Sequence, residues 1–211
     1  MPGAIPPRDC PLCPRLQAFR EDLRKRHPDW FNAPVPPFGP PDARVLIVGL
    51  APGMQGANRT GRPFTGDYAG DLLYQTLIGF GFARGTYGAR IHDGLELIDA
   101  RIANAVSCVP PENKPTGSEI GTCRRFLSAV IAEMPKLRAI VALGRIAHDS
   151  TVAALGTKRA AAPFGHGRKA MVDNFALFSS YHCSRYNTNT GVLTPEMFRA
   201  VFGAVRSHLE A

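Results

Sequence analysis

A glycine-rich loop carries the first side chains of this sequence whose types and spacing could do chemistry. Residues 49–67, GLAPGMQGANRTGRPFTGD, hold five glycines together with Arg59, Arg62 and the aromatic Phe64. Glycine accepts positive φ angles and lets the backbone approach a ligand, so a loop of this kind can bind phosphate. It lacks the Lys-Ser/Thr pair of a P-loop and the G-x-G-x-x-G spacing of dinucleotide sites. Two interpretations remain: an anion- or nucleotide-binding loop, or a solvated connection.

Asn104 and His182 each lie at the end of an apolar segment. Asn104 belongs to RIANAV, and His182 follows the apolar residues 175–181. A carboxamide donates and accepts hydrogen bonds at once, and an imidazole N–H can stabilise developing negative charge. Plainer roles are a turn-capping asparagine and a structural histidine. The remaining histidines lack this context and are predicted to be surface or core residues: His27, His92, His148, His166 and His208.

Five cysteines form the other chemically distinctive set, at positions 10, 13, 108, 123 and 183. Cys10 and Cys13 have the C-x₂-C spacing with which two thiolates bind one metal centre. Cys108 and Cys123 lie at a strand end and a helix start, so a four-thiolate site would tie the N-terminal segment to the rest of the fold. The alternative is burial of small residues beside a chance C-x₂-C. The spacing suits zinc and iron–sulfur alike.

Apolar runs and helical spacing predict the elements that position these residues. Buried strands are expected at residues 44–49, 102–106, 139–143 and 175–181. Helices are expected at residues 14–26, 68–80, 118–134, 145–155 and 195–208. This alternation predicts an α/β fold, a three-layer α/β/α sandwich around a mostly parallel four-stranded sheet. Ligands bind beyond the carboxyl ends of such strands, so the loops that follow them should hold the site.

The N-terminal part of the chain has a different character. Residues 27–43 contain six prolines, which prevent regular structure and predict an extended loop. We expect residues 1–211 to form a single domain, with the cysteine-bearing segment and this loop (about residues 1–43) packed on it.

Composition narrows the class of protein further. The chain has 211 residues, of which 45% are hydrophobic and 20% charged, as in ordinary folded domains. No apolar run approaches the roughly 20 residues that cross a bilayer, and the start, MPGAIPPRDCPLC, lacks the apolar region of a secretory signal. We therefore expect a cytoplasmic protein without membrane contact. The formal net charge of +8 suits nucleic acid as a partner, although a GC-rich genome would also enrich arginine.

Three segments together carry a family resemblance. GLAPG…GANRTGRPFTGD, NAVSCVPPENKPT and SYHCSRYNTNTGVLT resemble, in this order, the active-site motifs of the family 5 (type B) uracil-DNA glycosylases. The likeness extends from Cys10 to about Phe198. It implies the fold predicted above and a DNA repair enzyme that hydrolyses the N-glycosidic bond of uracil after base flipping. It also implies hypoxanthine, xanthine and other deaminated bases as further substrates. No lysine matches a Schiff-base role, so we expect a monofunctional enzyme that leaves an abasic site. We also expect a monomer.

The resemblance assigns roles around an extruded base. Phe64 would stack on the base, and Asn104 would accept from uracil N3–H while donating to O4. His182 would face O2 and stabilise the charge of the leaving base. Gly49, Ala51 and Gly53 complete the predicted substrate site. The predicted DNA-binding residues are Arg59, Arg62, Lys114, Ser184 and Arg185.

Water activation requires a separate residue. Other uracil-DNA glycosylases have an aspartate where this chain has Ala51, which cannot act as a base. Asp67 is the first candidate, although it could instead cap the following helix, and Asn58 could position water without ionising. Because an oxocarbenium-like sugar is a good electrophile, we expect Asp67→Ala to lower activity less than His182→Ala.

The resemblance also decides what the cysteines hold. It implies a structural [4Fe-4S] cluster bound by Cys10, Cys13, Cys108 and Cys123, with zinc as the alternative. The usual His-Pro-Ser motif is His182-Cys183-Ser184 here, and Cys183 is not predicted to be a ligand. Two other functions remain open: a type A (family 4) enzyme, which usually has glutamate where Leu50 stands, and a non-catalytic, metal-stapled nucleic-acid-binding protein.

Overall fold

Four parallel strands and one antiparallel edge strand form the central sheet of the molecule. This computed structural model describes residues 3–211, and the strand order is β4-β1-β5-β7-β6. The strands are β1 (Val45–Gly49), β4 (Ala100–Asn104), β5 (Ala139–Leu143), β6 (Lys169–Val172) and β7 (Phe175–Ser180). The first two pair in parallel, as do β1 with β5 and β5 with β7, whereas β6 runs antiparallel to β7.

Burial explains which strands the sequence predicts. Every residue of β1 and β5 is buried, because helices cover both faces of the sheet, and such strands are continuous apolar runs. The prediction of four strands is wrong by one, since β6 was missed. This strand has only four residues at the sheet edge, and its Met171 is 62% exposed. An edge strand that faces solvent has no apolar run to reveal it.

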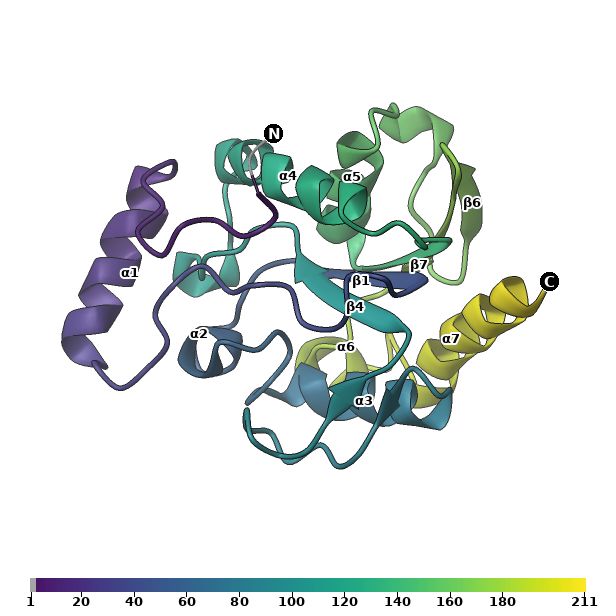
Figure 1. The fold of residues 1–211 in the computed structure, drawn as a ribbon, viewed down its shortest axis with the longest axis horizontal. Helices are drawn as coiled ribbons and strands as arrows, with labels where there is room; N and C mark the ends of the chain where they lie inside the picture. The colour runs from purple at the N-terminus through teal and green to yellow at the C-terminus, as the bar shows by residue number, and fades with distance from the viewer. Residues whose placement is uncertain (1–2) are drawn as a thin grey trace.

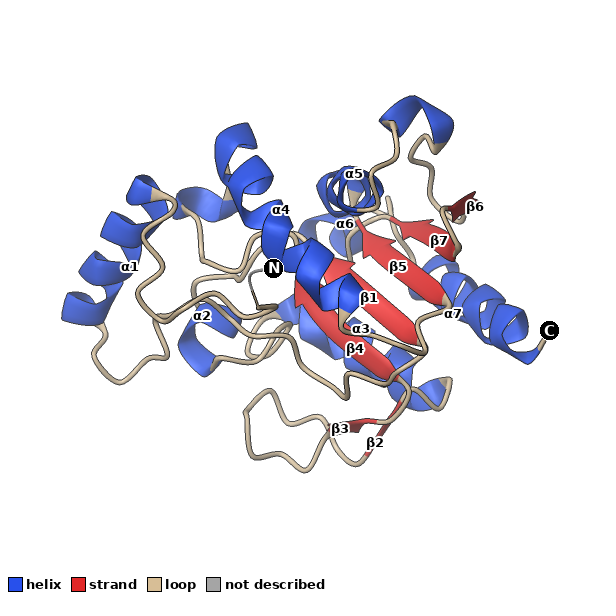
Figure 2. Cartoon of the chain, turned by 45° about the horizontal axis from the view of Figure 1, so that its top comes forward, coloured by secondary structure: helices blue, strands red, loops and turns tan. Residues whose placement is uncertain are grey.

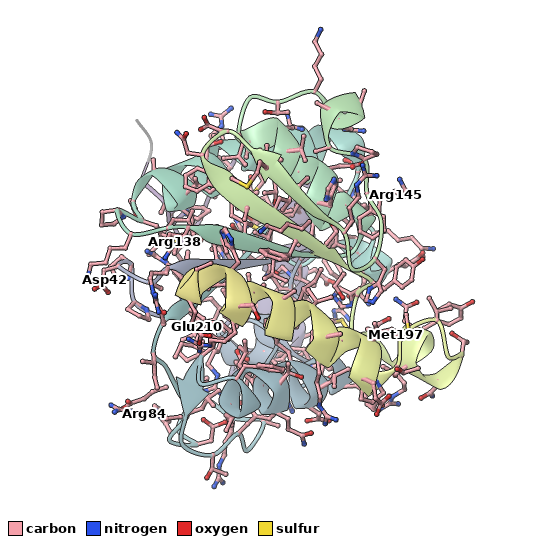
Figure 3. The ribbon with its side chains drawn as sticks, turned by 90° about the vertical axis from the view of Figure 1, so that its right-hand side faces the viewer. Asp42, Arg84, Arg138, Arg145, Met197 and Glu210 are labelled. Atoms are coloured by element: carbon pink, nitrogen blue, oxygen red, sulfur yellow. The ribbon has the colours of Figure 1, made fainter. Side chains whose placement is uncertain are left out.

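The three-layer α/β/α arrangement is confirmed. Helices α3 (Tyr68–Gly79) and α7 (Pro195–Glu210) cover one face of the sheet, and α4 (Gly117–Ala132) and α5 (Arg145–Ala154) cover the other (Figure 2). The α7 helix spans the molecule between the labelled Met197 and Glu210 (Figure 3). As its sequence suggests, α7 begins with Pro195 in its first turn after the N-cap Thr194, whose hydroxyl accepts from the Met197 amide.

Segments outside the sandwich frame the site. Helix α1 (Pro14–Arg26) lies at one side of the molecule (Figure 1), and its Leu16 packs with Val106 and Phe126. A small ribbon of β2 (Ala83–Arg84) and β3 (Glu96–Leu97) encloses residues 85–95. Single-turn helices α2 (Ala57–Thr60) and α6 (Arg185–Asn189), and 3₁₀ turns η1 (Pro111–Asn113) and η2 (Arg159–Ala161), complete the described elements. None of the helices described is long and apolar enough to span a membrane.

Candidate active site

Two neighbouring strand ends create the floor of the candidate site. Gly49 and Asn104, the last residues of β1 and β4, are paired in the register of the sheet. A Cβ atom at Gly49 would lie 2.5 Å from Asn104 Oδ1 and 2.8 Å from two ring carbons of Phe64. Only glycine therefore lets the Asn104 amide and the Phe64 ring lie side by side at this point.

A cavity of about 530 Å³ opens above this floor. Phe64, Asn104 and His182 all line it, although they come from separate segments: Asn104 ends β4, and Phe64 and His182 lie in the loops that follow β1 and β7. The remaining lining residues are Leu50, Ala51, Gly53, Met54, Gln55, Gly56, Ala57, Asp67, Tyr68, Ala69, Asn113, Ser184 and Arg185. The structure thus brings together most of the predicted substrate and catalytic residues, and their roles stay predictions.

A hydrogen bond to its backbone carbonyl group fixes His182, whose ring faces Phe64. Asn187 Nδ2 donates to the His182 carbonyl oxygen over 2.8 Å, and the neighbouring Cys183 thiol donates to the Ala69 carbonyl oxygen over 3.4 Å. The His182 and Phe64 rings stack with centroids 5.9 Å apart. Burial among these groups lowers the pKa of His182 to about 4, so the imidazole is neutral at pH 7. A neutral imidazole still offers one N–H donor.

Asp67 occupies the N-cap position of α3, but its side chain forms no capping hydrogen bond. Its carboxylate lies against Gly56, where a Cβ would come within 2.8 Å of the Asp67 Cγ. The buried Oδ1 has no hydrogen-bond partner among the described residues. Burial raises the pKa of Asp67, an effect that the backbone amides of Gly70 and Ala69 partly oppose. The carboxylate therefore lies at the start of the helix, and its Oδ1 remains without a protein partner.

The mouth of the pocket contains residues that sequence reasoning missed. Tyr68 lines it and is 37% exposed, and the Arg185 guanidinium lies 5.3 Å from the centre of its ring. Asn113 lines the other side, where its backbone has a positive φ of 57°. Tyr68 follows Asp67 directly, so its place beside the motif was a usable signal. Asn113 had no such signal beyond the motif PPENKPT.

Two predicted site residues are placed differently. Arg62 is only 6% exposed, and its guanidinium binds both carboxylate oxygens of Asp93, at 2.9 and 2.7 Å. This cation is buried and already paired, so its placement does not favour the predicted contact of Arg62 with DNA. Asn58 is buried outside the pocket lining, and its Nδ2 donates to Asn32 Oδ1 over 2.9 Å. Its Oδ1 has no partner among the described residues, and the role of Asn58 in positioning water stays a prediction that its place outside the pocket lining does not support.

The other predicted DNA-binding residues lie on or near the surface. Arg59 and Lys114 are exposed outside the pocket lining, and Lys114 lies 3.4 Å from Glu112 in an exposed ion pair. Ser184 lines the pocket, and its hydroxyl caps α6 by accepting from the Asn187 amide over 3.4 Å. The sequence did not predict this single helical turn.

The four cysteines predicted as ligands line one small apolar cavity. Cys10 and Cys13 approach it from the N-terminal segment, and Cys108 and Cys123 from the body of the fold. Burial is the main cause that raises the pKa of Cys13 to about 11, and nearby groups such as Cys123 and Cys10 raise it further. In residues 3–211, however, no three His, Cys, Asp or Glu side chains have the arrangement of a preformed metal site.

A buried arginine beside this cavity tests whether an anionic group fits there. Arg20 is 2% exposed, and it donates to the Cys108 sulfur over 3.3 Å and to the Cys10 carbonyl oxygen over 3.1 Å. Its Nε has no partner, and no carboxylate pairs with it in the described part of the chain. A buried cation without a counter-charge is strongly unfavourable. The donor set and this unpaired cation therefore fit a negatively charged thiolate centre.

Comparison with known proteins agrees with the fold and the pocket. A sequence model of the uracil DNA glycosylase superfamily matches residues 36–206. The α/β sandwich and the pocket at its strand ends thus define the class of protein, and the chain belongs to the uracil DNA glycosylase superfamily.

Individual relatives place the chain within this superfamily. It is 46% identical over 199 residues to a type-5 uracil-DNA glycosylase of Thermus thermophilus, covering 91% of this chain and 90% of the relative. A type-5 uracil-DNA glycosylase of Pyrobaculum aerophilum is 39% identical over 197 residues, covering 92% and 86%. A type-4 uracil-DNA glycosylase of the same organism is 32% identical over 152 residues, covering 72% and 63%. The chain belongs to the type-5 group, which confirms the resemblance noted in the sequence.

Proposed function

We propose that this protein is a uracil-DNA glycosylase that receives a flipped uracil and hydrolyses its N-glycosidic bond. The observation that carries the proposal is the one pocket shared by Phe64, Asn104 and His182. A base taken out of the DNA stack needs an apolar or aromatic surface and partners for its Watson–Crick edge, and this pocket offers both. The activity named for the type-5 relatives supports the same conclusion.

Recognition of uracil falls to Phe64 and Asn104. The phenyl ring stacks on the base, while the carboxamide accepts from N3–H and donates to O4. Cytosine presents the opposite donor and acceptor pattern, so a fixed amide rejects it by about 1–3 kcal/mol for a good bidentate pair. The close packing of Gly49 against both side chains supports a fixed amide orientation.

His182 stabilises the leaving base. As the bond to the sugar breaks, negative charge grows on uracil O2, and the His182 N–H donates a hydrogen bond to it. Because its pKa is about 4, the imidazole acts as a neutral donor at pH 7 and brings no charge into the pocket beforehand. One well-placed donor of this kind contributes about 3 kcal/mol to the transition state.

Asp67 activates or orients the attacking water. Its Oδ1 is buried without a protein partner, which leaves an acceptor for a water proton. The amides at the start of α3 help to keep the carboxylate ionised against the effect of burial. The water adds to the sugar carbon as the base departs, and its proton passes toward the carboxylate. Ionised phosphates of the DNA stabilise the positive sugar in the same step.

Two finer features of the activity follow from the pocket. None of the described lining residues is a lysine, so no amine is placed to form a Schiff base, and we propose a monofunctional enzyme that leaves an abasic site. A cavity of about 530 Å³ also has room for a two-ring purine base. We therefore include hypoxanthine and xanthine among the substrates.

The pocket is complete within one chain, which supports action as a monomer. We propose the cytoplasm as the location of the protein.

Contact with DNA surrounds the pocket mouth. Arg185 and the exposed Tyr186 follow His182, where they can bind phosphate and stack on unpaired bases. A second cavity of about 430 Å³ adjoins the first across His182 and reaches Arg145 at the start of α5. Arg59 and Lys114 add exposed positive charge from the loops around the pocket. This surface suits a polyanion more than a small nucleoside.

The cysteine cavity holds a [4Fe-4S] cluster in this proposal. Cys10, Cys13, Cys108 and Cys123 would bind it, and the cluster would supply a covalent link between the N-terminal segment and the sheet. Arg20 would offset the negative charge of the thiolates. Hydrolysis transfers no electrons, so the role is structural. A brown protein with visible absorbance and four iron atoms per chain is expected, whereas a colourless protein with one zinc would replace this assignment.

Release of free uracil from a uracil-containing oligonucleotide, followed by alkali cleavage at the abasic site, tests the function. We expect release by the wild-type protein and its loss in Asn104→Ala, whose folding is checked by circular dichroism. Strong DNA binding without any base release would instead favour the non-catalytic nucleic-acid-binding protein. Release by Asn104→Ala at the wild-type rate would remove this residue from the site.

A further inference from the structure

The backbone of Phe64 has an unfavourable conformation that its surroundings must maintain. Its φ angle is 52°, in the left-handed region that bulky side chains rarely occupy. The residue itself is 7% exposed and lines the pocket. Such strain persists only where neighbouring contacts over-determine it, and it concentrates at functional sites. The question is which residues hold this ring in place.

Two tyrosine hydroxyls fix the carbonyl groups on either side of the Pro63–Phe64 bend. Tyr74 donates to the Pro63 carbonyl oxygen over 2.6 Å, and Tyr87 donates to the Phe64 carbonyl oxygen over 3.1 Å. The two tyrosine rings also pack on each other, with centroids 4.7 Å apart. Tyr87 comes from residues 85–95, the segment between β2 and β3, which lies outside the resemblance motifs.

Arg62 restrains the other side of the same bend. Its Nε donates to Thr65 Oγ1 over 2.7 Å, so the residues before and after Phe64 are linked directly. Its guanidinium lies 5.3 to 6.0 Å from the ring centres of three aromatic residues, Phe38, Tyr74 and Tyr87. Arginine placed over aromatic faces in a buried site gains from cation–π attraction.

Asp93 joins these restraints. The Asp93 carboxylate accepts hydrogen bonds from two guanidinium nitrogens of Arg62. It also accepts from the backbone amides of Gly88, at 2.9 Å, and Leu95, at 3.2 Å. It therefore orients Arg62 and, through the Gly88 amide, shapes the turn that presents Tyr87. The Asp93 and Arg62 side chains are 2% and 7% exposed. Nothing in the uracil chemistry above uses this buried pair.

We propose that Asp93 and Tyr87 are positioning residues for base stacking: they hold the Phe64 ring against the flipped base. The inference rests on the proposed function, since it needs a base to stack on Phe64. It assigns residues 85–95 to the active site as an outer support, although these residues do not line the pocket. Substrate specificity would then depend on a contact well away from the reacting atoms.

Asp93→Asn and Tyr87→Phe test the proposal in complementary ways. Tyr87→Phe removes one hydroxyl and keeps the ring, and we expect about a threefold slower single-turnover release of uracil. Asp93→Asn weakens the link to Arg62, and we expect about a tenfold loss. The Kd for DNA that already contains an abasic site should remain unchanged in both, because no base stacks on Phe64 there.

A Phe64→Ala background separates positioning from general support of the fold. If Asp93 and Tyr87 act through the ring, adding either substitution to Phe64→Ala should cause no further loss. Equal fold-losses in both backgrounds would overturn the inference. Glu96→Gln is the matched control, because it breaks the exposed Arg84–Glu96 pair on the same ribbon, outside the pocket lining. We expect it to match the wild-type rate.

Outcomes for the two proposals remain distinct. Wild-type protein that releases no uracil would overturn the proposed function and this inference with it. Wild-type release combined with losses that multiply in the Phe64→Ala background would overturn the inference alone. Thermal unfolding of each variant identifies one that fails to fold, and Tyr87→Phe keeps the test decisive if Asp93→Asn does so.

Discussion

The active-site pocket and the cysteine cavity both contain residues from distant parts of the chain, but they differ in how far the protein itself satisfies their polar groups. In the pocket, hydrogen bonds within the protein hold His182 and the Phe64 loop in place. Beside the cysteine cavity, Arg20 is buried with an unpaired Nε and no carboxylate partner among the described residues. The pocket is therefore preorganised for a transient ligand, with Asp67 Oδ1 left open toward it, whereas the buried cation beside the cavity would be balanced by the anionic cluster that we propose.

This difference predicts how substitutions in the two regions should behave. Changes in the pocket should slow catalysis with little effect on stability. Changes in the cavity should lower stability and leave the pocket chemistry intact in whatever fraction of the protein remains folded. The predictions that follow can break or sharpen this contrast.

His182→Ala should have the largest effect on the pocket. Loss of the donor at the leaving base should slow single-turnover uracil release by about 10²–10³-fold. The midpoint of thermal unfolding should change little at pH 7, where this histidine is neutral. His208→Ala, which replaces a histidine on α7, is the control and should keep full activity. A His182→Ala enzyme within tenfold of the wild type would show that another group carries the leaving charge.

Cys108→Ser should have the largest effect on the cavity. The substitution takes away the sulfur that Arg20 contacts and a proposed cluster ligand, and we expect the free energy of unfolding to fall by about 3–5 kcal/mol. Iron content and visible absorbance should fall in parallel. Cys183→Ser removes a buried thiol outside the cavity and should retain the colour. Unchanged stability on denaturant titration would mean that the cavity, like the pocket, is complete without a bound group.

Some elements and site residues of the two regions could be predicted from the sequence, and others could not. Strands β1 and β5 were predictable because burial on both faces makes them continuous apolar runs. Asn104 and His182 were predictable because Asn104 ends the buried strand β4 and His182 comes shortly after β7. Edge strand β6 and the one-turn helices α2 and α6 left no periodic pattern to detect. They are short, and tertiary contacts rather than local propensity stabilise them.

Arg62 and Asp93 show a second limit. In the sequence Arg62 looked like a free cation in a basic loop, and only the fold shows that a carboxylate 31 positions away neutralises it. Pairing of this kind depends on tertiary distance, which spacing along a chain does not encode. The C-x₂-C pair was visible directly and the family resemblance implied the set of four cysteines, which the structure brings to one cavity, but nothing in the sequence pointed to Arg20 beside them.

Asp67→Asn should have an intermediate effect on the pocket. We expect about a 30-fold slower release, less than for His182→Ala, because a sugar with oxocarbenium character needs only weak assistance to the water. Asp71→Asn, an exposed carboxylate in the first turn of the same helix, is the control. A larger loss in Asp67→Asn than in His182→Ala would reverse the assigned order of importance.

The pH dependence of release distinguishes Asp67 further. Burial raises its pKa, so the carboxylate gains a proton, and activity falls, at a higher pH than for an ordinary aspartate. Asp67→Asn should therefore lose the part of the acid limb that protonation of this carboxylate causes. An identical acid limb in the two proteins would exclude Asp67 as the proton acceptor.

Arg185→Ala should have the smallest effect, because it changes the rim of the pocket and not its interior. Its guanidinium is exposed and lies over the Tyr68 ring, where it can contact one DNA phosphate. Losing that contact should weaken DNA binding about threefold. It should also reduce the slope of log K against log salt concentration by about 1. Lys136→Ala removes an equal charge just before β5, at the opposite ends of the strands, and should leave both quantities unchanged. Because binding affinity and single-turnover release are measured separately, the two substitutions show whether the positive rim acts only in DNA binding. A slower release at saturating Arg185→Ala enzyme would move this residue from the rim into the chemistry of the pocket.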